Sequence, residues 1–285
     1  MRSDTPPEAA FGTPPEAAFG TPPEALLSRL PPIRRARGFR LYDVKGRRYL
    51  DLSREGALLG HRGEGTLTAM KSVLSQGLVA ALPSIWEQRL AGALARQFPA
   101  YAEIRLYASP ERARRAAARY VGDPGAVVAD PALTTRSEET AAAYWRPFLP
   151  LPRARVLLPL LPVTVNGAPS PVCFDEEPRA DVPPSDRVPG FILAAAVRGF
   201  LALPSASLSL PRLERALDRA VGWARTGPYV RAVFPESDYA SVHEEFLREG
   251  VLLAPGYPGP SVLPGDCSSG EAQALVDLFT RIPGG

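Results

Sequence analysis

The chain has 285 residues, enough to bury a sizeable core in one large domain or two modest ones. Its hydrophobic fraction of 45% and charged fraction of 22% are those of an ordinary soluble globular protein. The 33 basic and 30 acidic residues nearly cancel, and no basic run carries interleaved aromatic residues, which argues against a nucleic-acid or membrane partner. Because no stretch approaches the roughly 20 apolar residues that span a bilayer and no signal-peptide core is present, we expect a cytoplasmic protein.

Nearly all of the basic residues are arginines. Lys45 and Lys71 are the two lysines, so any mechanism that needs an amine side chain has two candidates, both near the N-terminus. The densest basic run, residues 34–37, is interpreted as a solvated approach to the first strand. Cys173 and Cys267 lie far apart and the chain has only two histidines, so we expect no zinc site, and Cys173 in its apolar run is predicted to be buried.

The first feature along the chain is an eight-residue repeat. The sequence TPPEAAFG occupies residues 5–12, recurs at 13–20 and returns as a partial copy at 21–28. Each Pro-Pro pair removes backbone donors and favours polyproline II, so such a repeat suits neither a helix interior nor a sheet. The sequence predicts a disordered tail that grew by tandem duplication, with peptide docking as the alternative.

Regular elements are predicted from residue 39 onward. In chain order they are a hairpin of strands 39–43 and 48–52, helices 64–76 and 85–97, a strand at 104–107 and a helix at 110–120. Leu67 and Leu74 are expected on the buried face of the first helix, and Ile85 and Leu94 on that of the second.

The middle of the chain contains short apolar runs. Residues 126–129, 155–158 and 172–174 are interpreted as strands buried on both faces of a parallel sheet. Prolines interrupt these runs densely, which predicts a sheet with reduced helical covering.

The C-terminal third is predicted to form a compact α+β unit. Its expected elements are a helix at 211–224 with Trp223 inward, a strand at 229–234, a helix that begins at Asp238 and ends before Gly250, a strand at 251–253 and a last helix near 270–281. Gly250 suits a left-handed C-cap.

Two segments carry a family resemblance. Residues 41–52, LYDVKGRRYLDL, are followed by Gly60-His61, and residues 248–255 read REGVLLAP. The first segment is similar to the N-terminal hairpin and glycine-histidine turn of class III aminotransferases, and the second to part of their small domain. The glutamate-1-semialdehyde aminomutase branch looks nearest. The resemblance covers roughly residues 30–285, with a shorter middle than in working enzymes.

The resemblance implies an α/β protein with a shortened pyridoxal-phosphate (PLP)-dependent transferase fold type I. Such a fold has a three-layer αβα large domain and a C-terminal α+β small domain. The expected ranges are 1–30 for the disordered repeat, 31–63 for a hairpin segment of the small domain, 64–205 for a reduced large domain and 206–285 for the small domain. Because members of the family are typically homodimers, a homodimer is expected here too.

The segment that matches the family's phosphate-binding loop is altered. These enzymes place a Ser-Gly-Thr loop at a helix start, where backbone N–H groups and the helix dipole meet the phosphate. Here Ser109 is kept, but Pro110 replaces the glycine and removes a donor, and Glu111 places a carboxylate beside the anion. Like unit charges about 4 Å apart repel by roughly 4 kcal/mol at an effective dielectric near 20. Ser109 is therefore at most a remnant of a phosphate contact.

Two further positions concern the pyridine ring and the Schiff base. Asp175, in the run Phe-Asp-Glu-Glu after an apolar strand, matches the aspartate that pairs with the pyridine nitrogen. Its alternative role is a strand-end aspartate capping a turn. In the run that resembles the family's lysine segment, Phe191 stands at the lysine position, and Ala194–Ala196 replace three glycines, which favours helix and fills the space.

These positions favour a catalytically inactive relative that serves as a structural or regulatory partner, because phenylalanine cannot form an aldimine. No catalytic residue is predicted, and no cofactor is expected; if there is one, it is pyridoxal phosphate. One alternative is an active enzyme that still binds PLP as an aminotransferase or aminomutase. Another is a scaffold that binds an unknown protein through its proline-rich tail. A lysine supplied by another chain is also left open.

Overall fold

The computed structural model describes residues 23–53, 58–61, 63, 65–134, 140–206, 208 and 210–281. The helices are α1 (Pro23–Leu27), α2 (Thr66–Ser75), α3 (Ile85–Gln97), α4 (Pro110–Val121), α5 (Gly190–Ala202), α6 (Pro211–Leu217), α7 (Glu236–Arg248) and α8 (Ser269–Arg281), with a 3-10 turn at Leu203–Ser205. The strands are β1 (Ile33–Arg37), β2 (Arg40–Asp43), β3 (Arg48–Asp51), β4 (Glu103–Tyr107), β5 (Thr140–Trp145), β6 (Ala154–Pro159), β7 (Ser170–Phe174), β8 (Trp223–Thr226), β9 (Tyr229–Ala232), β10 (Val251–Leu252) and β11 (Ser261–Val262).

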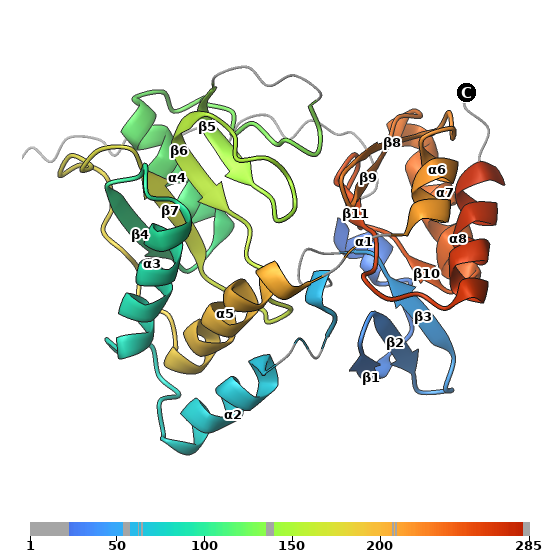
Figure 1. The fold of residues 1–285 in the computed structure, drawn as a ribbon, viewed down its shortest axis with the longest axis horizontal. Coiled ribbons are helices and arrows are strands. Elements are labelled where there is room, and N and C mark those ends of the chain that lie inside the picture. The colour runs from blue at the N-terminus through green and yellow to red at the C-terminus, as the bar shows by residue number, and fades with distance from the viewer. Residues whose placement is uncertain are drawn as a thin grey trace, which may run out of the picture.

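These elements form two lobes (Figure 1). The large lobe consists of the sheet β4-β7-β6-β5 and helices α2 to α5. The small lobe consists of the sheets β1-β2-β3-β10 and β11-β9-β8 with helices α1, α6, α7 and α8.

The sheet of the large lobe is mixed, so the prediction of a parallel sheet is wrong. Strand β7 runs antiparallel to both β4 and β6, and β5 runs parallel to β6. It follows that β4, β5 and β6 point the same way while β7 points the opposite way. Short apolar runs predict burial on both faces, but strand direction depends on distant pairing that the runs do not encode.

Helices cover both faces of this sheet. Helix α4 packs on one face, where Tyr107, Val172 and Phe174 belong to the same buried cluster as its alanines. Helices α3 and α5 pack on the other face against Leu106, Leu157 and Cys173. The large lobe therefore has the predicted three-layer αβα arrangement, and Cys173 is fully buried as expected.

The small lobe joins the two ends of the described chain. The predicted hairpin is formed by β2 and β3, and β3 pairs in parallel with β10. The core contains residues from the hairpin, such as Leu50, together with Trp223, Phe246 and Phe279 from the C-terminal third. Helix α7 ends before Gly250, whose φ of +83° is the left-handed conformation expected there.

Several predicted boundaries are wrong for physical reasons. Residues 126–129 contribute only a single bridge, at Ala129, because Val127 faces solvent. The neighbouring strand β5, with the sequence TAAAYW, was missed because alanine is a poor strand former. Helix α6 ends at Leu217 instead of 224, and Trp223 begins strand β8.

Two predicted helix faces are also incorrect at their ends. Helix α2 buries Val73, whereas Leu67 and Leu74 are each 39% exposed. Helix α3 buries Leu90 and Leu94 as expected, but Ile85 is 56% exposed. Leu67, Leu74 and Ile85 are exposed instead of contributing to the core.

The N-terminal part departs from the sequence prediction at two places. Residues 34–37, interpreted as a solvated approach to the first strand, belong to strand β1 itself, which pairs antiparallel with β2. Residues 23–27 fall in the predicted tail but form α1, because the third repeat carries leucines in place of alanine and phenylalanine and Leu26 is buried. The first two repeats lie outside the described residues, as do the last four residues of the chain. Within the described ranges, none of the helices combines the length and apolar character needed to cross a bilayer.

Candidate functional site

The carboxyl ends of three strands meet at one edge of the large sheet. Because β4, β5 and β6 point the same way, Tyr107, Trp145 and Pro159 end at this edge, which we call the carboxyl edge. Ligands of open α/β sheets bind beyond the carboxyl ends of strands. This edge is therefore the place to look for a cofactor site.

Ser109 lies at the carboxyl edge as the N-cap of α4. Its hydroxyl accepts the backbone N–H of Arg112 at 3.3 Å, and its carbonyl accepts that of Ala113 at 3.1 Å. Pro110 has no N–H to offer. The pKa of Glu111 is lowered by hydrogen bonds from its own backbone N–H and from the Ser109 hydroxyl. The chain itself therefore satisfies the donors of the first turn of α4.

The backbone N–H of Ala108, just before α4, donates a hydrogen bond to Asp186. One Asp186 oxygen accepts the backbone N–H of Ala108 at 2.9 Å and Nε of Arg112 at 2.6 Å, and the other accepts from the same guanidinium at 2.5 Å. Partial burial raises the pKa of Asp186, but the hydrogen bonds from Arg112 and Ala108 outweigh it and hold the pKa below its usual value. A carboxylate of the chain thus stands where an anionic ligand would meet the helix start.

Asp175 follows β7 and is also held by neighbours. It accepts the Tyr120 hydroxyl at 2.6 Å and lies 3.4 Å from Nε of Arg155, whose guanidinium sits over the Tyr120 ring. Burial, followed by the hydrogen bond to Asp175, raises the pKa of Tyr120. The Tyr120 hydroxyl also accepts the backbone N–H of Glu176 at 3.2 Å. These contacts fit the alternative interpretation of Asp175 as a strand-end residue that fixes a turn.

The structure does not bring Ser109 and Asp175 together. In the β4–β7 register, Tyr107 pairs with Ser170 and Glu103 pairs with Phe174, because the strands are antiparallel. Asp175 therefore lies beside Ala102 at the opposite edge, and the backbone of Ala102 donates to the carbonyl of Phe174. Tyr107 lies five residue steps along the strand from Ala102, a span of about 17 Å. A single small cofactor cannot reach both side chains along this sheet.

Phe191 is the second residue of α5. It is partly buried and packs against the cluster that α3 and α5 form on the sheet. Ala194, Ala195 and Ala196 follow in the same helix and are fully buried. The expectation that these alanines form helix and fill space is confirmed.

The two lysines lie on other elements. Lys45 sits in the turn between β2 and β3, where its backbone N–H donates to Asp43. Lys71 is exposed on α2. The strand ends at the carboxyl edge carry no amine side chain.

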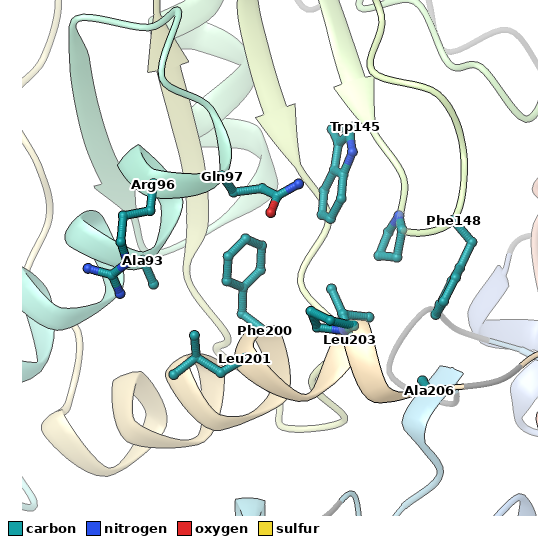
Figure 2. A pocket seen from close by; sticks show the side chains of 11 residues that line it. Ala93, Arg96, Gln97, Trp145, Phe148, Phe200, Leu201, Leu203 and Ala206 are labelled. Carbon is teal, nitrogen blue, oxygen red and sulfur yellow. The ribbon is translucent and has the colours of Figure 1, made fainter.

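A pocket of about 490 Å³ opens where α3, α5 and the segment after β5 meet (Figure 2). Trp145, Phe148 and Phe200 give it an aromatic lining. In Figure 2, Gln97 extends toward Trp145, whereas Arg96 turns the other way. Among the residues that the structure describes, its lining contains no carboxylate, histidine, cysteine or lysine, so these residues can hold an apolar group but offer no general acid, base or nucleophile.

The residues at the carboxyl edge do not fit pyridoxal phosphate. The helix-start donors are used within the chain, the nearest carboxylate is Asp186 in an ion pair with Arg112, and no amine is present for a Schiff base. Sequence reasoning missed Asp186. No local signal marks it, because Asp186 lies 74 residues from Arg112 in the sequence.

Comparisons with known proteins agree with the fold. No family model matches the sequence. An uncharacterized protein of Treponema pallidum is 29% identical over 290 residues, covering 84% of this chain and 90% of the relative. An uncharacterized protein of Borreliella burgdorferi is 42% identical over 65 residues, or 22% of this chain and 24% of the relative.

Solved structures with the same fold include three transaminase-type enzymes. An omega-transaminase from Sphaerobacter thermophilus matches with a TM-score of 0.61 and 15% identity, over 88% of this chain and 90% of that one. Ornithine delta-aminotransferase of Plasmodium falciparum gives 0.60 and 12%, over 88% and 92%. A glutamate-1-semialdehyde aminomutase from Pseudomonas aeruginosa gives 0.60 and 13%, over 88% and 87%. The chain therefore has a shortened PLP-dependent transferase fold of type I.

Proposed function

We propose that this chain is a non-catalytic protein built on the aminotransferase fold, which acts in the cytoplasm as a homodimeric structural or regulatory partner. The observation that carries the proposal is the closed first turn of α4. The Asp186 carboxylate accepts the backbone N–H of Ala108 and the Arg112 guanidinium, and the Ser109 hydroxyl accepts the backbone N–H of Arg112. A phosphate dianion would have to displace this carboxylate and its charge-assisted hydrogen bonds.

The position of the amines supports the same proposal. Covalent capture of an aldehyde needs a primary amine next to the bound cofactor. Phe191 packs into the apolar cluster of α5, and the two lysines belong to a hairpin turn and to the exposed side of α2. The described lining of the aromatic pocket beside α5 adds no group that could move a proton.

An apolar surface supports the homodimer. Leu67 and Leu74 lie one above the other on α2 and are each 39% exposed. The segment that follows exposes Val79, Leu82 and Ile85 by 55% to 57%. Exposed apolar residues gathered in this way are typical of protein–protein contacts.

The test of the inactive site is spectroscopic. Pyridoxal phosphate is added to the purified protein, the visible spectrum is recorded, and the mass is measured after borohydride reduction. We expect no absorption band that borohydride removes and no gain of a pyridoxyl group. A stoichiometric adduct that disappears in Lys71→Arg or Lys45→Arg would overturn the proposal.

The test of the homodimer is sedimentation. The Val79→Glu, Leu82→Glu double variant is expected to sediment as a monomer, because burying two carboxylates in an apolar contact is costly. Val127→Glu is the matched control, since Val127 is 85% exposed and lies outside this surface. If the parent protein sediments as a monomer, the dimer part of the proposal is wrong while the inactive site is untouched.

A further inference from the structure

A stripe of arginine side chains lies along one side of α4. Arg112, Arg115 and Arg119 occur at spacings of three and four residues, so their side chains share one stripe of the helix. Together with Tyr107 and Pro183 they line a pocket of about 160 Å³. Ligand sites for drug-sized molecules usually measure about 300 to 1,000 Å³, so this pocket suits a compact group.

The positive charges of this pocket are only partly balanced. Arg112 is paired with Asp186. Arg119 donates to the backbone carbonyl of Asp181 at 3.1 Å, an acceptor that orients the guanidinium without neutralising it. The Asp181 carboxylate itself lies 3.8 Å from Arg179.

Arg115 forms no ion pair with any residue that the structure describes. Like charges three or four residues apart on a helix repel each other, so this stripe reduces the stability of α4 when it is empty. A bound anion would remove that repulsion. Two guanidinium groups with free donors also match the geometry of a phosphoryl group.

The segment of residues 181–183, which borders the pocket beside α4, is held in place by hydrogen bonds to the sheet. The Tyr107 hydroxyl donates to the carbonyl of Pro183 at 2.7 Å, and Arg105 donates to the carbonyls of Val182 and Pro183 at 2.8 and 3.0 Å. Segment 181–183 is therefore fixed against the sheet and cannot fold away from the guanidinium groups. The pocket is preorganised before any ligand arrives.

We propose that Arg115 and Arg119, together with Arg112 in the same lining, bind a phosphoryl dianion, either free phosphate or a small phosphate monoester. The site shares Arg112 with the closed first turn of α4, but its main ligands, Arg115 and Arg119, lie farther along the helix, and the inference does not depend on the proposed function.

The test compares two variants that lose the same charge. Arg115→Gln, Arg119→Gln removes the two unbalanced guanidinium groups, and Arg153→Gln, Arg212→Gln removes two exposed arginines elsewhere. Thermal shift and calorimetric titration with inorganic phosphate are run at constant ionic strength in chloride. We expect phosphate to stabilise the parent and the control, and to bind the first variant at least about tenfold more weakly, the loss typical of charge-assisted hydrogen bonds. Circular dichroism verifies that each variant is folded.

Equal binding to both variants, or no stabilisation of the parent beyond that given by chloride, would overturn the site. A parallel titration with glycerol 3-phosphate separates the two sources of the group. If it binds as well as phosphate, the ligand is a monoester; if only inorganic phosphate binds, the ligand is the free anion. Both results support the site.

Discussion

Three carboxylates that each pair with an arginine differ in how far the pair is shielded from solvent: Asp130 at the junction of the lobes, Glu271 within the small lobe and Asp186 at the start of α4. Asp130 at the junction and Glu271 in the small lobe are similarly buried, at 11% and 10% exposure, but the partner of Asp130, Arg146, is 6% exposed whereas the partner of Glu271, Arg40, is 17% exposed. Asp186 at the start of α4 faces an arginine that is 52% exposed. The buried pairs hold elements together, whereas the third closes a helix start that a ligand could otherwise use. The free energy of unfolding should therefore respond very differently to the loss of each carboxylate.

Asp130→Asn is expected to have the largest effect. Asp130 accepts both arms of the Arg146 guanidinium, at 2.7 and 2.6 Å, and Arg146 also stacks on Tyr229 of the small lobe. Replacing one partner of a buried, bidentate ion pair is destabilising, here by about 3 kcal/mol. Urea denaturation measures the change. Asp181→Asn, at a carboxylate that is 61% exposed, is the control and should change stability very little. Similar midpoints for both variants would refute the role of the junction pair.

Glu271→Gln is expected to have an intermediate effect. Glu271 on α8 accepts Nε and a second nitrogen of Arg40 on β2, at 2.8 and 2.6 Å, and so ties the hairpin to the last helix. Loss of this partly buried pair should destabilise the protein by about 2 kcal/mol. Glu249→Gln, at an exposed carboxylate, is the control.

The same residue predicts an acid dependence. The Arg40 hydrogen bond is the main cause that lowers the pKa of Glu271 to about 2. Since the native pKa is lower than that of the unfolded chain, the contribution is fully present above the usual glutamate value and is lost as the pH falls toward 2. Between pH 5 and 2 the stability of Glu271→Gln should fall less steeply than that of the parent. Parallel curves would contradict this assignment.

Asp186→Asn is expected to have the smallest effect. An asparagine oxygen can still accept the Ala108 N–H, but the charge opposite Arg112 is lost. Because Arg112 is half exposed, solvent screens the pair and the change should be about 0.5 to 1 kcal/mol. Urea denaturation with Asp181→Asn as the control measures it. A loss as large as that of Asp130→Asn would show that the start of α4 is a structural anchor of the fold.

Local chemistry made part of the molecule predictable. The hairpin around Lys45-Gly46, the start of α4 at Pro110 and the left-handed Gly250 depend on residues that are neighbours in sequence, and each is where the sequence indicates. The alanines of α5 likewise form helix.

Long-range features could not be predicted in the same way. The direction of β7 is set by pairing with β4 and β6, and it decides that Asp175 and Ser109 lie at opposite edges. The role of Asp186 depends on segment 181–186 returning to α4, a contact over 74 residues that no local pattern marks. Ile85 and Leu67 look like core residues by spacing, yet they face outward because no other described element covers them.

The parallel pairing of β3 with β10 also has a consequence for synthesis. The hairpin of β2 and β3 emerges from the ribosome early, but Leu50 and Asp51 meet Val251 and Leu252 only after some two hundred further residues have been made. The large lobe can complete its sheet long before that. Translation should therefore yield a nascent chain in which the large lobe is folded while β3 still lacks its partner strand β10. Chaperones would bind the unpaired edge of β3 first.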